Sequence, residues 1–549
     1  MSCRVRVIHS VITLRPVDGR LPANAELPRW DTPRAVRAAA ALLGLAVIGA
    51  YLAIALARLS YPFPLEVLES NSLVEVHRIL TGQPLYGAPT VSYVPDGYPP
   101  LYFALSAWLA SALGTAYLPL RLVSLVSSLA CFAMLARLVQ RETQSPAAGM
   151  AAAGVLAATY FAASDWFDVA RVDSLFLALS VAALYAARWM RRTRGAIAAG
   201  LLAGAAFLTK QTALAEGVAV LAAVAAGPRR RLAIPAAATY GAVAGGSTLL
   251  LGLASHGWYV YYVFEQMSEH TLIPAAAVLF WTRYLLPTLG VAVCAVVLGA
   301  RRMPPVLLAG CAALVVEGYA ALVHAGGNVN DALPAYLVTA LLAGLALGAR
   351  PGIMAGRLVS HLRRGAIAGR ESARAGQWAA GVVAGLVLVQ LAVLAAGFRP
   401  GRAIPSDADR AVGLRLVAGV RALGGTVAIP ADPGLALLAG LSPGEDQVAA
   451  ADVLHASDQA AAAIFTGSAV RAVAMRQFTA IITQLPKDLR GFPANLARFY
   501  YRCPAMPLAG LPPAPFRTGA GAGGRPVSVW VPVGRGSCAA ALRVLERPR

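Results

Sequence analysis

Long apolar runs constrain this chain more than any other feature. They are about 16 to 24 residues long, and about 20 such residues span a bilayer as one helix. Short stretches that contain Arg, Gly or Pro separate them. The whole chain is 58% hydrophobic and 13% charged, with a mean hydropathy of +0.63. A soluble core of 549 residues does not need so much apolar side chain. The sequence therefore predicts an all-α polytopic membrane protein.

We predict eleven transmembrane helices, with ends uncertain by a few residues. They lie at residues 36–59, 117–139, 147–164, 172–190, 196–209, 212–227, 232–254, 283–300, 304–324, 331–349 and 376–397. The apolar segment 98–114 is left out, because as a helix it covers only about 25 Å. The hydrocarbon core is about 30 Å thick. We expect this segment to lie at the interface, with Pro99 and Pro100 in its first turn.

Arginine clusters predict the orientation. The net charge of +21 comes largely from Arg in the short loops, which points to membrane topology and excludes nucleic acid as a partner. The clusters lie at residues 137–141, 191–194, 229–231, 301–302 and 350–374. Eleven spans that start inside place every cluster in the cytoplasm. We expect a multi-pass protein of the inner (plasma) membrane, with a cytoplasmic N-terminus, an uncleaved first span and the last 150 residues or so outside.

Three parts follow from this topology: a cytoplasmic segment 1–35, a transmembrane domain 36–397 and a small extracytoplasmic α/β domain 398–549. Long apolar runs stop in the last part, and "GGTVAIPADPGLALLAG", "FTAIITQLP" and "VSVWVPVG" favour strands and a helix. Residues 509–526 are typical of a loop or linker. Cys503 and Cys538 lie in this domain, where an oxidising compartment favours a disulfide, although two free thiols are the alternative.

The first outer loop, residues 60–98, carries acids directly after the first span. Glu66 and Glu69 are three residues apart and share a face of a helix. The pattern that follows is amphipathic and ends at Gly82 and Pro84. A solvated loop with a capping acid explains these residues in part. A carboxylate at the membrane edge also suits a general base, because ionisable residues there are costly without a partner or a task.

Two further outer segments carry charge. In "SDWFDVARVDSLFLALS", Asp168 and Arg171 could form a salt bridge within one helix, or Arg171 could bind a phosphate and Asp173 a sugar hydroxyl or Arg171 itself. Only two of the 47 basic residues are Lys, and Lys210 lies between two apolar runs on the outer side, next to Gln211. It either binds a phosphate group as a point charge or reaches the lipid headgroups.

The remaining polar segments have weaker signals. Asn328 and Asn330 follow two glycines and precede a span, so they either cap a helix or face a pocket. Residues 256–270 are rich in aromatic side chains, which favours an interfacial belt. No spacing of His, Cys or carboxylates suggests a metal site, so we expect no cofactor, with a divalent cation as the alternative that the residues do not support.

The stretches "LESNSLVEVHRILTGQPLY" and "GYPPLYFALSAWL" resemble the first outer loop of the GT-C superfamily of glycosyltransferases, which includes protein O-mannosyltransferases and lipid A aminoarabinose transferases. The similarity covers about residues 36–350. It implies inverting transfer of a sugar from a polyprenyl-phosphate carrier to an extracytoplasmic hydroxyl of a glycan, lipid or protein. Glu69 falls where the family has its catalytic acid, and Glu66 is the other candidate. The resemblance implies substrate-binding roles for a further set of residues: Tyr98, Asp168, Arg171, Asp173, Lys210, Gln211, Asn328 and Asn330.

Two other functions compete with this hypothesis. A transporter or flippase of lipid-linked sugars would show repeats and broken helices at mid-membrane, and the sequence shows charged residues at span ends instead. A non-catalytic membrane scaffold would tolerate loss of Glu69, whereas an enzyme would lose turnover.

Overall fold

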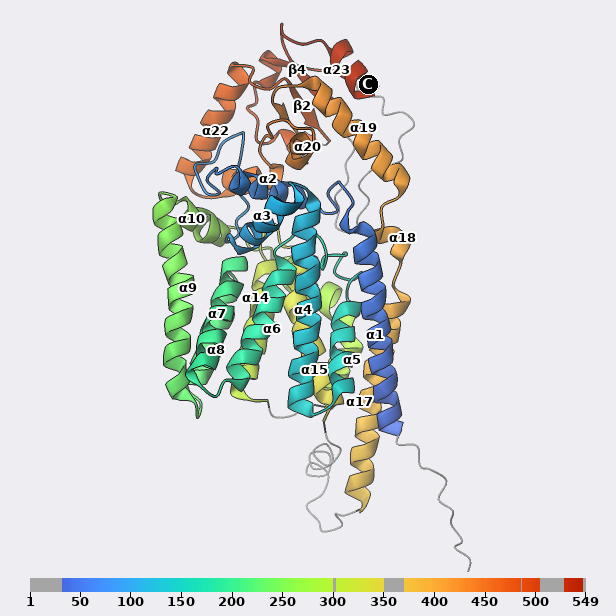
Figure 1. The fold of residues 1–549 in the computed structure, drawn as a ribbon. Coiled ribbons are helices and arrows are strands. Elements are labelled where there is room, and N and C mark those ends of the chain that lie inside the picture. Colours follow the sequence, from blue (N-terminus) through green and yellow to red (C-terminus); the bar gives the residue numbers. More distant parts are fainter. Residues whose placement is uncertain (1–31, 300–302, 350–369, 485, 504–527, 547–549) are drawn as a thin grey trace, which may run out of the picture.

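A helical bundle capped at one end by a smaller domain makes up the chain in a computed structural model (Figure 1). The structure describes residues 32–299, 303–349, 370–484, 486–503 and 528–546. Several parts of the sequence lie outside the described residues: Cys3, most of the segment 1–35, the Arg cluster at 301–302 and the predicted linker 509–526. Of the Arg cluster at 350–374, only the backbone of residues 370–374 is described.

Each predicted span coincides with a helix of the bundle. These helices are α1 (Thr32–Leu59), α4 (Tyr117–Thr143), α5 (Pro146–Ala158), α6 (Asp173–Trp189), α7 (Thr193–Thr209), α8 (Ala213–Ala225), α9 (Ala233–Ala254), α13 (Leu286–Leu298), α14 (Pro305–Leu322), α15 (Leu333–Leu347) and α17 (Arg370–Ala396). Within the described residues, seven helical stretches are long and apolar enough to cross a membrane, while α5, α7 and α8 are shorter apolar helices. The all-α membrane fold is confirmed, and the number of crossings stays a prediction.

Two helices lie across the end of the bundle that faces the C-terminal domain: α2 (Glu69–Leu80) and α3 (Leu101–Leu113). Leu73 and Val76 of α2 are fully buried in one cluster with Tyr102 and Phe103 of α3. Gly82 follows with φ +69°, a left-handed conformation that glycine adopts without strain. The amphipathic pattern after Glu69 thus forms the expected helix, and α3 takes the place expected for segment 98–114.

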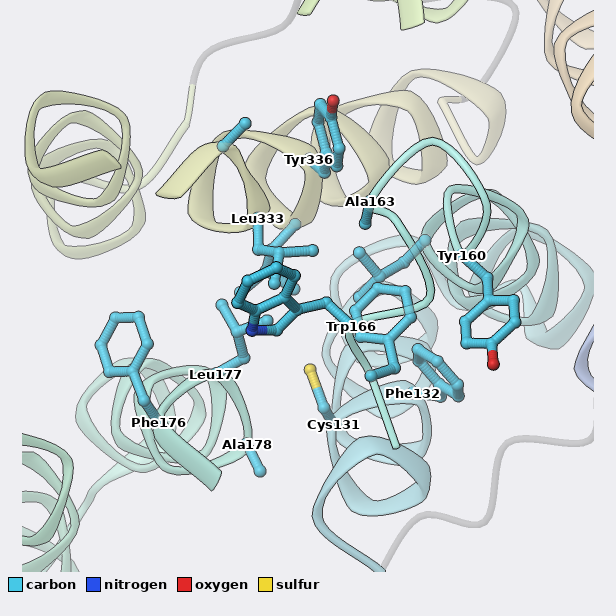
Figure 2. Close-up of a cluster of buried hydrophobic side chains, with 14 of the residues drawn as sticks. Cys131, Phe132, Tyr160, Ala163, Trp166, Phe176, Leu177, Ala178, Leu333 and Tyr336 are labelled. Atoms are coloured by element: carbon cyan, nitrogen blue, oxygen red, sulfur yellow. The ribbon is translucent and has the colours of Figure 1, made fainter. Parts of the chain in front are cut away.

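Residues 159–172 form a buried loop between α5 and α6. The predicted span 147–164 is too long, because α5 ends at Ala158 and the chain then turns into the bundle. Figure 2 shows Tyr160, Ala163 and Trp166 of this loop among aromatic and aliphatic side chains of α4, α6 and α15. Tyr160 and Trp166 are 0% and 2% exposed. This packing holds the loop in place, and it thereby fixes the position of the charged residues later in the loop.

The C-terminal domain contains a four-stranded sheet in the order β1-β2-β4-β3. β1 pairs with β2 in parallel, and β4 is antiparallel to both β2 and β3. The larger elements are α19 (Asp407–Leu423), β1 (Val427–Ala428), α20 (Pro433–Leu438), α21 (Gln447–His455), α22 (Gln459–Ala474), β2 (Ala480–Thr483), β3 (Tyr500–Arg502), β4 (Ser528–Pro532) and α23 (Cys538–Glu546). Cys503 and Cys538 form a disulfide with Cα atoms 5.3 Å apart, as expected.

Three short helices lie between α9 and the next span: α10 (Trp258–Val260), η2 (Tyr261–Glu265) and α11 (Gln266–Ser268). α12 (Pro274–Leu279) and η3 (Phe280–Leu285) continue into α13, and η4 (Val329–Ala332) continues into α15, so the span predicted at 283–300 begins earlier, at Pro274. Tyr259 and Tyr262 are fully buried in one cluster with Ala449 and Phe465 of the C-terminal domain. Tyr259 and Tyr262 thus pack between protein elements, whereas Trp258 and Phe264 are partly exposed, and the interfacial belt expected for residues 256–270 stays a prediction for these two rings.

Candidate active site

Both carboxylate oxygens of Glu69 take part in a buried ion pair. Arg121 of α4 donates from Nε and Nη2 to the two carboxylate oxygens, at 3.0 and 2.7 Å. The backbone N–H groups of Leu65 and Ala170 donate to the same oxygens. Although burial raises the pKa of the Glu69 carboxyl, Arg121 and these N–H groups hold it below its usual value. A carboxylate bound in this way is a weak proton acceptor, and it ties the first outer loop to the loop before α6.

Glu66 lies near a different cation. Its Oε2 is 3.8 Å from Nε of Arg171 and accepts a hydrogen bond from the N–H of Leu68. Burial raises the pKa of Glu66 to about 7, and the nearby Arg171 offsets this only in part. Nη2 of Arg171 donates to the hydroxyl of Tyr98 at 3.0 Å. Its Nε and Nη1 have no hydrogen-bond acceptor in the described part of the chain.

Lys210 is the centre of a second charged group. Its Nζ donates to Oδ1 of Asp173 at 3.0 Å and to Oδ1 of Asp331 at 3.1 Å. Nδ2 of Asn330 lies 3.3 Å from the same Asp173 oxygen, and the indole N–H of Trp166 donates to the other oxygen at 2.8 Å. All five side chains are buried or nearly so. The structure thus brings together three segments that are far apart in the sequence, around residues 166–173, 210 and 330–331.

Asp168 lies outside this group. Its carboxylate accepts two hydrogen bonds from Arg58 of α1, at 2.6 and 2.8 Å, and one from the hydroxyl of Tyr160 at 3.0 Å. The pairing of Asp168 with Arg171 considered from their spacing is wrong, because Arg58 neutralises Asp168. This contact fixes the buried loop against α1.

The other two predicted site residues, Asn328 and Gln211, make different kinds of contact. Asn328 caps η4: its Oδ1 accepts from the N–H of Val329, and its own N–H donates to Asp331. Gln211 donates to the carbonyl oxygen of Gly97 at 2.7 Å, and its Oε1 has no partner among the described residues. Gln211 therefore joins the end of α7 to the first outer loop, whereas Asn328 has a structural explanation.

A cavity of about 490 Å³ lies where these segments meet the C-terminal domain. Tyr98, Lys210, Gln211 and Asp331 line it, together with Asp96, which the sequence did not single out. Other residues of the wall come from the end of α14 and from α21, namely Glu317, Ala320, Val448, Ala449 and Asp452. Glu66, Glu69 and Arg171 do not line the cavity, although Arg171 contacts Tyr98 directly behind it.

Asp96 is the acid of the first outer loop that lines the cavity. Its Oδ1 accepts a hydrogen bond from Asn71 at 2.8 Å, and its Oδ2 has no partner in the described structure. Burial raises the pKa of Asp96, and Arg171 and Asn71 offset the effect only in part. An acid with a free oxygen and a raised pKa is suited to accept a proton from a bound hydroxyl.

A second, apolar groove of about 790 Å³ shares one wall with this cavity. Phe264 lines both. The rest of the groove comes from α7, α8, α9 and α10, including Phe207, Leu214 and Leu249. Leu249 and its neighbours Leu250 and Leu253 on α9 are more than half exposed. The groove is therefore suited to an apolar chain that reaches the cavity from the bilayer.

No cluster of three or more His, Cys, Asp or Glu side chains that could hold a metal ion occurs within the described residues. The candidate site is consequently built from cations and single carboxylates.

Comparison with known proteins gives two kinds of similarity. Residues 98–256 match the model of the dolichyl-phosphate-mannose-protein mannosyltransferase family. No curated protein matches the chain.

Among solved structures, ArnT from Cupriavidus metallidurans bound to undecaprenyl phosphate is similar at 13% identity and a TM-score of 0.55, over 90% of this chain and 98% of that one. Its apo form gives 12% identity and a TM-score of 0.53, over 92% and 99%. An archaeal oligosaccharyltransferase, AglB from Archaeoglobus fulgidus, is less similar, with 12% identity and a TM-score of 0.48 over 83% and 73%. The match to the family model and the fold shared with ArnT confirm the resemblance to the GT-C superfamily that the sequence indicates.

Proposed function

We propose that this chain is a glycosyltransferase that moves a sugar from a polyprenyl-phosphate carrier to an extracytoplasmic hydroxyl, with inversion at the anomeric carbon. The observation that carries the proposal is the cavity in which Asp96, Tyr98 and Lys210 meet. The mannosyltransferase family model over residues 98–256 and the bound undecaprenyl phosphate of the structurally similar ArnT support a lipid-linked donor.

The base is an acid of the first outer loop. We assign this role first to Asp96, because it lines the cavity and its Oδ2 has no hydrogen-bond partner among the described residues, and second to Glu66. Glu69 was the expected base, and we assign it a positioning role instead, because Arg121 and two backbone N–H groups use both of its oxygens.

The reaction follows from these roles. The Asp96 carboxylate takes the proton of the acceptor hydroxyl, whose oxygen attacks the anomeric carbon from the face opposite the phosphate. The bond between that carbon and the phosphate oxygen breaks, and the carrier leaves as polyprenyl phosphate. Cations stabilise the charge that develops on the phosphate. Lys210 lines the cavity, and Arg171 has two unused donor nitrogens behind Tyr98.

The apolar groove is the binding site that we assign to the polyprenyl tail of the carrier. A polyprenyl tail is apolar and remains in the bilayer while its phosphate enters the site. The groove beside α9 shares Phe264 with the cavity, so a lipid in the groove would bring its headgroup toward Lys210.

A gene deletion combined with matched variants tests the proposal. Deletion should remove one sugar from the envelope glycans, and the native chain should restore it. Asp96→Asn should fail to restore it, because loss of a general base typically costs about 10²–10⁴ in rate. The control is Gln144→Glu, a change at an exposed residue just after the far end of α4. A chain in which Asp96→Asn restores the sugar as well as the native one would exclude this mechanism.

A second assay, on purified protein in detergent, separates the enzyme from a flippase of lipid-linked sugars. An enzyme forms the glycosylated acceptor and free polyprenyl phosphate in detergent, where no membrane barrier exists. A flippase forms neither product there, so their absence in a sample that binds the donor would favour the flippase.

A further inference from the structure

A basic hollow lies at the opposite end of the bundle from the candidate active site. It has a volume of about 660 Å³, and four of the six residues that line it are Arg191, Arg229, Arg230 and Arg231. These arginines come from the α6–α7 and α8–α9 loops, which Figure 1 shows at the end of the bundle away from the C-terminal domain.

Arg229 holds the two loops together. Its Nη1 donates to the backbone carbonyl oxygens of Arg188 and Met190, at 3.0 and 2.9 Å. Arg188 itself is paired with Glu142, at 2.7 Å. The loops are therefore fixed relative to each other, and the hollow between them is a built feature and not a chance gap between mobile side chains.

The other three arginines are exposed and have no carboxylate partner within the described residues. Arg191, Arg230 and Arg231 form no ion pair there. The sequence explains this isolation, because segments 174–215 and 217–264 contain no Asp or Glu. Three guanidinium groups around one hollow repel each other, and an anion with several oxygens would relieve that repulsion.

The hollow opens beside a lipid-facing surface. Leu232 completes its wall, and Ile234, two residues further into α9, is 75% exposed. Only 17% of the apolar stretch around α9 is buried inside the protein, so most of this helix faces the bilayer. A ligand in the hollow would have its charged part among the arginines and an apolar part along α9.

We propose that this hollow binds the phosphodiester headgroup of an anionic phospholipid, with an acyl chain along α9. Arg191, Arg230 and Arg231 donate to the phosphate oxygens, and Arg229 positions the two loops. This site is separate from the donor cavity, and it does not depend on the transfer reaction.

Basic residues at this end also act as a topology signal, which requires charge but no binding site. The two roles differ in what they predict for the purified protein. A topology signal acts during insertion, whereas a lipid site retains anionic lipid after extraction and loses it as salt increases.

The test measures how much lipid the full-length purified protein retains in detergent, by native mass spectrometry. Dioleoylphosphatidylglycerol is the anionic probe and dioleoylphosphatidylcholine the neutral one. The variant R191Q/R230Q/R231Q removes the three exposed arginines. The control R415Q/R471Q/R498Q removes three exposed arginines from the C-terminal domain. Thermal unfolding of each variant shows that it is folded before lipid is added.

We expect the first variant to need roughly 100-fold more phosphatidylglycerol for half-saturation, because each arginine near an anionic surface contributes about fivefold. The control should bind as the native protein does, and phosphatidylcholine should not distinguish the three. Inorganic phosphate should displace no more lipid than sodium chloride of the same ionic strength. Equal retention by the two triple variants, or greater displacement by phosphate than by sodium chloride at the same ionic strength, would overturn the proposal.

Discussion

Replacing Glu69 by Gln tests whether this residue positions the first outer loop or acts as the base. Gln has nearly the same shape as Glu, so the change removes the charge and one acceptor and leaves no cavity. Arg121 then keeps its hydrogen bonds to the carbonyl oxygens of Tyr61 and Phe63, both at 2.6 Å, but loses its only carboxylate partner in the described structure.

The magnitude follows from the burial of the pair. The side chains of Arg121 and Glu69 are 1% and 0% exposed, so solvent does not screen the charge that remains. Removal of one partner from such a pair costs about 3–5 kcal/mol. The reverse change, Arg121→Gln, should cost a similar amount. The double variant should lose less than the sum, because it leaves no unpaired charge, and the difference is the coupling energy of a double-mutant cycle.

Thermal unfolding in detergent and transfer activity are measured on the same samples. We expect Glu69→Gln to lower both the melting temperature and the activity, with Arg121→Gln lowering both to a similar extent. Asp96→Asn should lower activity with a much smaller change in melting temperature. Asp96 has one oxygen without a hydrogen-bond partner, and within the described residues it forms no ion pair.

The opposite pattern would refute this reasoning. If Glu69→Gln unfolds at the native temperature, if the cycle with Arg121→Gln is additive, and if transfer is nevertheless lost, then Glu69 is the base and not a positioning residue.

Three further predictions concern donor binding, pH and topology. Lys210→Met should weaken donor binding and stability together, since it leaves Asp173 and Asp331 without the cation between them. Adding Asp331→Asn to this variant should restore part of the melting temperature but not the binding of a polyprenyl-phosphate sugar. Activity should fall as the pH is lowered through the raised pKa of Asp96, above the usual range of an Asp, because the base must be ionised, and Asp96→Asn should abolish this dependence. A cysteine at Arg141 should react with an impermeant thiol reagent only from the side opposite the C-terminal domain, and labelling from the same side would contradict the predicted topology.

Periodicity and charge in the sequence predicted the helices, because membrane spans and an amphipathic surface helix are local properties. The run before Arg58 and the pattern from Glu69 to Leu80 appear as α1 and α2 where they were expected. The disulfide between Cys503 and Cys538 was predicted because they are the only two cysteines of the sequence in the predicted outer domain. The cluster of Asp173, Lys210 and Asn330 contains three predicted site residues, which the structure brings into contact.

Pairing between distant residues could not be predicted in the same way. Arg58 and Arg121 lie inside apolar spans, and their partners are 110 and 52 residues away in the sequence. One signal was available: an arginine within a span needs a buried acid, and Glu66, Glu69, Asp165 and Asp168 were candidate acids just beyond the outer span ends. Asp96 was less visible still, because the sequence gives no indication that its second oxygen is left free.

The charged residues near the cavity differ in whether they are already neutralised, and this difference is what makes transfer plausible. Arg58 with Asp168 and Arg121 with Glu69 are closed pairs, whose task is to fix loops where water is excluded. Asp96 and Arg171 keep polar atoms without partners, although an unsatisfied buried polar group is costly. That cost is offset if a ligand supplies the missing partners. An acceptor hydroxyl would give Asp96 its missing partner, and a carrier phosphate would meet Lys210 in the cavity with the charge of Arg171 behind Tyr98, so the site is best completed when both substrates are bound.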